Sequence, residues 1–343
     1  MDAARKRGLG SRRARPTGGF VIAVLCGGVG AARMLAGLQA VVDPGEIVAV
    51  VNTGDDTELH GLHVSPDLDT ITYTLAGAVN PATGWGLRDE TFHAMDGLER
   101  YGAITWFRLG DTDLATHLYR TGRMREGATL SQVTGEISRA WGLGVRLVPM
   151  SDDPVRTRLR LADGREVAFQ EYFVKLRHSV VVDRVRFEGA ERATPAPGVL
   201  DALGSADIVV VAPSNPVVSI GPILAVPGVA EVLKARRHSV VAVSPIVAGA
   251  ALKGPADRLL VELGGEASAP GVARFLSSFA GTLVIDEADA QRRGEVEQAG
   301  VRCVVAPTVM RTPELAAGLA RAVLGARGMA AGPSGSPGAA FDA

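Results

Sequence analysis

The sequence is poor in cysteine: its 343 residues include only Cys26 and Cys303, which lie far apart. Two isolated thiols exclude a disulfide framework and indicate no cysteine-based metal site. Net charge is also lacking, because 36 lysines and arginines balance 37 aspartates and glutamates to a formal charge of -1. This balance gives no electrostatic reason to expect nucleic acid or an anionic membrane as a partner. We therefore expect neither partner and a cytoplasmic location.

Long hydrophobic runs are absent as well, since no apolar stretch reaches the ~20 residues that a membrane helix needs. Residues 1–19 carry many basic side chains without an apolar segment. We interpret them as a flexible basic extension or a misassigned start and not as a secretory signal. Residues 328–343 are rich in glycine, alanine, proline and serine, which predicts a disordered tail. A single domain is expected over 20–327.

Short apolar segments alternate with helical patterns through this region. The predicted strands are 20–26, 46–52, 145–149, 207–212, 239–244, 282–286 and 301–305. This alternation predicts an α/β, Rossmann-like fold, in which a mostly parallel sheet has helices on both faces. The stretch 156–187 breaks the rhythm with short alternating strands around an Ala-Asp-Gly turn. It predicts an inserted smaller subdomain, mixed or β-rich.

A glycine turn, containing Gly27, Gly28 and Gly30, follows the first strand and precedes a helical segment. Glycine allows a tight turn and close approach of the backbone, and a helix N-terminus presents amides and partial positive charge to an anion. The turn therefore predicts a phosphate site, with a plain strand-to-helix connection as the alternative. Arg33 replaces the third glycine of a dinucleotide fingerprint, and Asn52 stands where an acidic residue would bind ribose. These departures disfavour an NAD-dependent oxidoreductase.

Four carboxylates follow the turn: Asp55 and Asp56 come directly after the second strand, and Asp67 and Asp69 begin the next helical segment. Such a group beside a phosphate site would repel itself without a cation, and Mg²⁺ uses one or two carboxylates together with substrate phosphates and water. We predict Asp55 and Asp69 as Mg²⁺ ligands and Asp56 as a substrate-binding residue. A solvated acidic loop is the alternative. Asp67, like Ser65, is interpreted as a helix N-cap.

Two further loops contain candidate binding residues. Trp85 and Arg88 lie in a glycine-containing segment whose aromatic and guanidinium groups suit a flat heterocycle with a polar edge, although a helix start with Trp85 in the core is equally compatible. Ser214 and Asn215 lie between two prolines after the most apolar strand, where they offer a hydroxyl, a donor and an acceptor. His117, on another predicted helix, is assigned no role.

Eight motifs in order carry a resemblance to a known family: GGVGAAR, VNTGDD, GLHVSPDLDT, GWGLRDETF, LGDTDLATH, MSDDPV, APSNPVVSIGPILAVPG and VSPI. The chain resembles the 2-phospho-L-lactate transferase family of coenzyme F420 biosynthesis from Val21 to about Arg321. It looks more like the actinobacterial members, which use a phosphoenolpyruvate-derived donor, than like the archaeal ones, which use a phospholactate-derived donor.

The resemblance implies a Mg²⁺-dependent phosphotransferase with two substrates. The donor is guanosine-diphospho-enolpyruvate or -lactate, and the acceptor is the deazaflavin Fo. The ribityl hydroxyl of Fo attacks the phosphoryl group that carries the three-carbon acid, GMP leaves, and the product is a phosphodiester, dehydro-F420-0 or F420-0. A homodimer is also implied. The sequence leaves open which acid the donor carries.

The resemblance also implies residue roles on the donor side. Gly27, Gly28 and Gly30 would lie along the donor's phosphates, with Ser214 and Asn215 on the nucleotide side. The alternative from a different class is a non-catalytic regulator that binds a nucleotide sugar, similar to the gluconeogenesis factor proteins, which share the glycine turn and fold.

On the metal and acceptor side, the resemblance implies that Asp55 and Asp69 are catalytic residues that hold Mg²⁺, with Asp69 also orienting the attacking hydroxyl. Trp85 and Arg88 would contact Fo. Thr112 replaces an arginine that related sequences often have, which puts any contact of that side chain with Fo in doubt.

Overall fold

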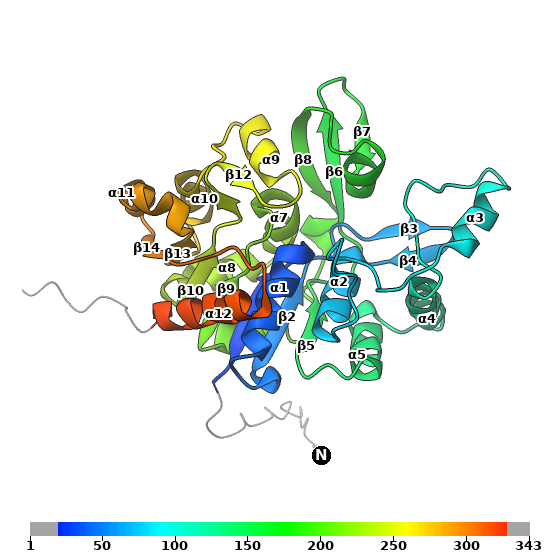
Figure 1. Ribbon diagram of the computed structural model, residues 1–343, viewed down its shortest axis with the longest axis horizontal. Coiled ribbons are helices and arrows are strands. Elements are labelled where there is room, and N and C mark those ends of the chain that lie inside the picture. The colour runs from blue at the N-terminus through cyan, green and yellow to red at the C-terminus, as the bar shows by residue number, and fades with distance from the viewer. Residues whose placement is uncertain (1–19, 328–343) are drawn as a thin grey trace, which may run out of the picture.

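The computed structural model describes residues 20–327 and is built on a seven-stranded parallel sheet (Figure 1). The two predicted terminal segments, 1–19 and 328–343, lie outside the described residues. All seven predicted strands are confirmed as the members of this sheet. In spatial order they are β14 (Arg302–Val305), β13 (Thr282–Ile285), β10 (Val240–Val243), β9 (Ile208–Val211), β1 (Ile22–Cys26), β2 (Ile47–Val51) and β5 (Arg146–Pro149).

Helices cover both faces of the sheet, as predicted, because alternate strand residues point to opposite faces. In β1, Ile22 and Val24 belong to one apolar core and Ala23 and Leu25 to the other. The helices that contribute to the first core are α1 (Gly28–Gln39), α2 (Pro66–Leu75), α5 (Leu130–Ala140) and α12 (Pro313–Arg327). Those that contribute to the second are α6 (Val199–Ser205), α7 (Gly221–Ala225), α8 (Val229–Ala235), α9 (Ala256–Glu262), α10 (Ala269–Leu276) and α11 (Arg293–Gln298).

Local sequence explains how several helices begin. Pro66 occupies the first position of α2, where its fixed φ and missing N–H suit a helix start. Thr129 and Gln132 form a reciprocal capping box at α5, and the Ser268 hydroxyl accepts a hydrogen bond from Gly271 N at α10. Short helical turns occur at Pro44–Glu46, Glu171–Lys175, Ala190–Arg192, Pro216–Ile220, Arg237–Ser239 and Glu287–Arg292.

The predicted insertion contains a three-stranded antiparallel sheet with the order β7 (Glu166–Ala168), β6 (Arg156–Leu161) and β8 (Val182–Glu188). It stands at the top of Figure 1. Its apolar residues, such as Leu159 and Tyr172, pack together with Val218 and Leu259 of the main body. The insertion therefore shares a core with the body and forms part of one wall above the main sheet.

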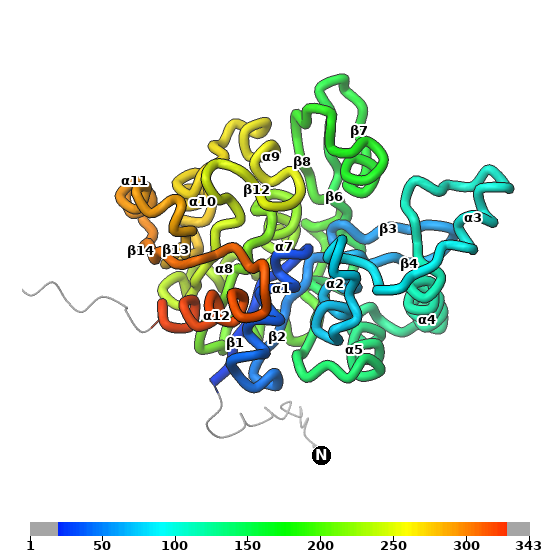
Figure 2. The backbone as a smooth tube through the Cα atoms, in the orientation of Figure 1, coloured from blue at the N-terminus to red at the C-terminus, as the bar shows by residue number. Residues whose placement is uncertain are grey.

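A second extension is built from β3 (Thr57–Leu59), β4 (Leu62–Val64) and α3 (His93–Glu99), next to α4 (Asp113–Arg125). The tube in Figure 2 shows it reaching away from the sheet on the side of β5. A small apolar cluster that includes Leu59, Met95 and Leu109 stabilises it. The last paired strands, β11 (Ile246–Val247) and β12 (Ala250–Ala251), form a short hairpin after β10.

A membrane-spanning helix is not found among residues 20–327. No single helix there has the required length and apolar character. One pair of helical segments has them only when the two are taken together across a 97° bend: Pro216–Ala225 and Val229–Ala235.

Candidate active site

A cavity of about 480 Å³ lies at the carboxyl ends of β1, β2 and β9. The loops that follow these strands contribute residues 27–30, Asp55 and Ser214 to its wall. Strand β1 has β2, the next strand in the chain, on one side and β9, which comes much later, on the other. Open α/β sheets bind ligands at such a switch point. The wall is completed by α2, by α4 and by residues that follow β7 in the insertion.

The three glycines of the turn have different physical reasons for lacking a side chain. A Cβ on Gly27 would lie 2.6 Å from Asp67 Oδ2, and one on Gly30 would lie 2.5 Å from the carbonyl oxygen of Pro213. Gly28 has a φ of +75° and faces open space within 4 Å. Gly27 and Gly30 are thus required by packing within the protein, and Gly28 is the one whose Cβ would enter the cavity.

The predicted N-cap role of Asp67 is wrong. Ser65 occupies the N-cap position of α2 without capping it, because its hydroxyl donates instead to Asp56 Oδ2 at 2.7 Å. Asp67 lies in the first turn, where its carboxylate accepts from Gly28 N at 2.8 Å and from Asn52 Nδ2 at 2.9 Å. An internal carboxylate therefore occupies one of the amide donors that the glycine turn would otherwise offer to a phosphate.

Asp55 and Asp67 are buried close to each other, and the charged form of each is disfavoured. Burial is the main cause of the raised pKa of Asp55, with the charges of Asp67 and Asp56 adding to it. Burial also raises the pKa of Asp67 to about 6, against the opposing hydrogen bonds from Asn52 and Gly28. Neither carboxylate pairs with a basic side chain of the described residues, so that its charge is compensated only by a proton or by a bound cation.

The fit of this side to a divalent cation can be judged from the oxygens that lack partners. Asp55 Oδ1 and Asp56 Oδ1 are buried and accept no hydrogen bond from the described part of the chain. Asp55 lines the cavity, whereas Asp56 does not and is held by Ser65 and His63. Within residues 20–327 no three His, Cys, Asp or Glu side chains form a metal cluster. One or two carboxylates nevertheless fit Mg²⁺, which takes its other oxygens from phosphates and water.

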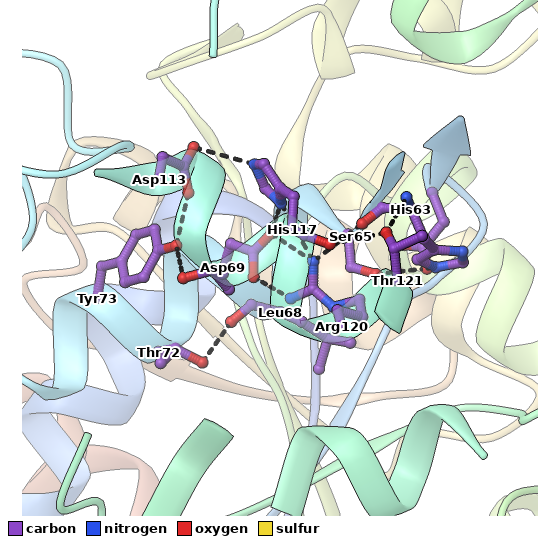
Figure 3. Close-up of polar contacts among 12 residues, drawn as sticks. His63, Ser65, Leu68, Asp69, Thr72, Tyr73, Asp113, His117, Arg120 and Thr121 are labelled. Carbon is purple, nitrogen blue, oxygen red and sulfur yellow. Dashed lines mark hydrogen bonds and ion pairs between the residues drawn. The ribbon is translucent and has the colours of Figure 1, made fainter. Parts of the chain in front are cut away.

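Asp69 lines the same cavity but is bound to Arg120, a residue that sequence reasoning did not select (Figure 3). Arg120 Nη1 donates to Asp69 Oδ2 at 3.2 Å, and Nη2 donates to Asp69 Oδ1. The side chains are 2% and 7% exposed, so that this is a buried ion pair. Asp69 therefore has its negative charge neutralised within the protein, in contrast to Asp55 and Asp67.

The polar contacts continue along α4 to Asp113 (Figure 3). Arg120 Nη1 lies 3.3 Å from His117 Nδ1, and His117 Nε2 lies 3.3 Å from Asp113 Oδ2. The Tyr73 hydroxyl of α2 donates to Asp113 Oδ1 at 2.5 Å. Asp113, Thr116, His117, Arg120 and Thr121 recur at helical spacing on one buried face of α4. The helical spacing of these polar residues was a sequence signal for them, but their burial is not visible in the sequence.

Trp85 lines the cavity and is 55% exposed, in a loop where Gly84 and Gly86 both have positive φ. Arg88 is exposed, donates to the carbonyl oxygen of Gly77, and is not among the lining residues. Thr112 does not line the cavity either. The structure thus brings Trp85 to the cavity and leaves Arg88 outside it.

Ser214 and Asn215 line the cavity, but their side chains have partners within the protein. The Ser214 hydroxyl donates to the carbonyl oxygen of Gly27 at 2.9 Å and accepts from Gly27 N at 3.2 Å. Asn215 Oδ1 accepts from Val217 N at 3.0 Å. Both residues hold loops in place, and Asn215 retains its amide NH₂ as a donor.

Sequence reasoning also missed three groups on the rim. Phe169 and Phe173 of the insertion stack with ring centroids 5.5 Å apart and planes at 10°, and both line the cavity. Lys253, from the loop after β12, lines it too and donates to the carbonyl oxygen of Thr83. A Cβ built on Gly84 would lie 3.2 Å from Lys253 Nζ and 3.8 Å from Arg33 Nη2, which places these two cations near each other.

Comparison with known proteins identifies the family. Residues 22–306 match the family model described as 2-phospho-L-lactate transferase CofD. The chain belongs to this transferase family. Among curated members, a phosphoenolpyruvate transferase of Streptomyces griseus is 47% identical over 310 residues, with 88% of this chain and 97% of the relative covered. Another, from Mycolicibacterium smegmatis, is 42% identical over 323 residues, covering 90% and 99%.

Solved structures support the fold alone. A crystal structure of a Bacillus halodurans protein, titled as a member of the UPF0052 family, superposes with a TM-score of 0.59 at 16% identity and covers 89% of this chain and 98% of that one. This likeness agrees with the Rossmann-like architecture of the present protein.

Proposed function

We propose that this protein transfers a phosphate-linked three-carbon acid, enolpyruvate or lactate, from a guanosine-diphospho donor to the ribityl hydroxyl of Fo, with release of GMP. Family membership supports the transferase class. The observation that carries the finer proposal is the buried, unneutralised carboxylate pair Asp55 and Asp67 beside the glycine turn. A diphosphate can approach this negative site only together with a cation.

The donor's phosphates are assigned to the side of the cavity formed by α1 and the loop after β9. The amides of Val29 and Gly30, in the first turn of α1, have no intrahelical acceptor by position and can donate to phosphate oxygens. Lys253 and Arg33 lie near this turn, and neither forms an ion pair with an acidic side chain of the described residues. They offer positive charge to the donor from the rim.

Mg²⁺ would be held through Asp55, which has a free buried oxygen, with Asp67 as the neighbouring carboxylate. The predicted ligand Asp69 already pairs with Arg120, so that we assign it a smaller part in binding the cation. When bound, the ion would offset the charge of the diphosphate and of the leaving GMP phosphate. The hydrogen bonds from Ser214 to Gly27 and from Asn52 to Asp67 hold the glycine turn and Asp67 in place beside this site.

Fo is assigned to the opposite side of α2, toward α4. Phe107 and Tyr73 supply aromatic surface there, and Trp85, whose neighbour Gly84 lies beside Lys253, borders the two sides. Phosphoryl transfer depends mainly on positioning and on electrostatic stabilisation. The protein's task on this side is therefore to hold the attacking hydroxyl in line with the phosphorus.

The test is incubation of the purified protein with Fo, Mg²⁺ and each of the two guanosine-diphospho donors, followed by mass spectrometry of the product. We expect a phosphodiester with one donor, an equal amount of GMP, and loss of both with EDTA or in Asp55→Asn. Tight binding of a UDP-sugar without binding of Fo would instead support the regulator alternative. The homodimer and the cytoplasmic location stay predictions, and light scattering of the purified protein would measure the former.

A further inference from the structure

The proposed function leaves one group at the cavity wall without a role: His117, Asp113 and the residues that hold them. His117 lines the cavity although its side chain is only 1% exposed. Asp113 lines it too, with a side chain 17% exposed. Figure 3 shows the two side chains facing each other at one end of the polar chain that begins at Asp69.

The proton of His117 is located by its neighbour Arg120. Arginine nitrogens only donate, and Arg120 Nη1 lies 3.3 Å from His117 Nδ1. Nδ1 is therefore the acceptor, and the neutral imidazole carries its proton on Nε2. A proton on Nδ1 would face a fully buried guanidinium, which disfavours the other neutral tautomer, and Nε2 carries a proton in the imidazolium as well.

His117 Nε2–H is consequently a donor that lines the cavity, yet it has no hydrogen-bond partner among the described residues. Asp113 Oδ2 is only 3.3 Å away, but the contact lacks hydrogen-bond geometry. A buried donor without a partner is unfavourable, because it has lost its hydrogen bond to water. The same site thus presents an unsatisfied donor and, next to it, a carboxylate acceptor.

The Asp113 carboxylate is held as an acceptor. Its Oδ1 receives the Tyr73 hydroxyl proton at 2.5 Å, and the Tyr73 oxygen in turn accepts from the Thr116 hydroxyl, whose Oγ1 lies 2.9 Å away. Although burial opposes its charge, the neighbouring His117, the Tyr73 hydrogen bond and the charge of Arg120 leave its pKa lowered. Asp113 is accordingly ionised at neutral pH and is a poor proton acceptor for catalysis.

The chemistry of the ligand follows from this pair. A phosphate or carboxylate would be repelled by Asp113, and a carbonyl could accept from His117 but could not donate to Asp113. A hydroxyl does both, since its oxygen accepts from Nε2–H while its hydrogen is donated to Oδ2. A neutral polyol is the ligand class that matches.

We infer that His117 and Asp113 form a hydroxyl-binding subsite for the sugar-alcohol chain of the acceptor, with Arg120 fixing the tautomer of His117 and Tyr73 orienting Asp113. This inference rests on the proposed function for the identity of the acceptor. It gives a role to the histidine that the sequence left unassigned. It also separates the two substrates by charge: the anionic donor binds on the α1 side and the neutral chain on the α4 side.

The experiment measures the dissociation constants of Fo, and of the deazaflavin chromophore without its ribityl chain, by fluorescence titration. In Asp113→Asn and His117→Asn we expect the affinity for Fo to fall about tenfold, the effect of losing one such hydrogen bond of ~1.4 kcal/mol. Binding of the chainless chromophore should be unchanged. His117→Gln, whose amide nitrogen can replace the Nε2 donor, should retain Fo affinity within a few-fold.

Thr121→Val is the matched control, because Thr121 is buried on the same face of α4 but does not line the cavity. It should lower the melting temperature slightly without changing the ratio of the two affinities. Equal losses for Fo and for the chainless chromophore, or no loss in Asp113→Asn, would overturn the subsite while leaving Fo as the acceptor. If the unaltered protein does not bind Fo, the proposed function fails and the subsite fails with it.

Discussion

The Asp69–Arg120 pair gives the strongest stability prediction. Both side chains are almost fully buried and are joined through two guanidinium nitrogens. Removing one partner leaves a buried charge uncompensated, at a cost of about 3–5 kcal/mol. We expect this loss from Asp69→Asn and also from Arg120→Met. The double variant should cost much less than the sum of the two, because no unpaired charge remains.

Urea denaturation followed by circular dichroism measures these free energies of unfolding. Arg160→Met is the control, since Arg160 and Asp183 form an exposed pair, at 45% and 48%, which is expected to contribute no more than about 1 kcal/mol. Single losses below about 1 kcal/mol, or costs that add in the double variant, would refute a buried, mutually neutralising pair. A loss of turnover in Asp69→Asn has to be interpreted against this loss of stability before it is assigned to metal binding.

Three further predictions concern the other side of the cavity. Gly28 and Gly142 have φ of +75° and +68°, with open space around both, so that Gly28→Ala and Gly142→Ala should each lose about 1–2 kcal/mol of stability from left-handed backbone strain. Only Gly28→Ala should also weaken donor binding, and equal donor affinity would remove Gly28 from the site. Because the pKa of Asp67 rises from 3.8 to about 6, its stabilising contribution is fully present below pH 4 and falls by about 3 kcal/mol as pH rises through 6. The free energy of unfolding should fall less over this pH range in Asp67→Asn or with Mg²⁺, and an identical dependence on pH would contradict this. Lys253→Ala should raise the KM for the donor about tenfold and leave Fo affinity unchanged, whereas Lys175→Ala, which removes an exposed ion pair with Glu171, should change neither. An effect of Lys253→Ala on Fo alone would invert the assignment of the two sides of the cavity.

The main sheet was predictable because its strands are continuous apolar runs bounded by turn residues. The segment Ile208–Val211 is fully buried, as an interior strand of a parallel sheet must be. The glycine turn and the aspartates after β2 could also be placed, because strand ends in a parallel sheet meet at one edge. What periodicity could not supply was the neighbour of each side chain across the fold.

Arg120 and Lys253 show why the rest of the site was missed. Arg120 lies 51 residues from Asp69 in the chain, and a polar residue on a predicted helix is ordinarily solvated. Lys253 reaches the rim only because the loop after β12 lies against the loop around Gly84. Arg88 illustrates the reverse case: its motif indicated a ligand contact, but its side chain lies outside the cavity and donates to the backbone carbonyl of Gly77, just after α2.

The two aspartates that open α2 differ in their partners in a way that suits the two unlike substrates of the proposed reaction. Residues two apart on an α-helix point about 200° away from each other, because each residue turns the helix by about 100°. Asp67 therefore contacts Gly28 of α1, and Asp69 contacts Arg120 of α4. The four carboxylates therefore do not gather into one cluster, although Asp55, Asp67 and Asp69 line the same cavity. In the proposed reaction, the helix presents an unneutralised carboxylate to the donor side, where a cation would bind, and a neutralised one to the side assigned to the uncharged chain of the acceptor.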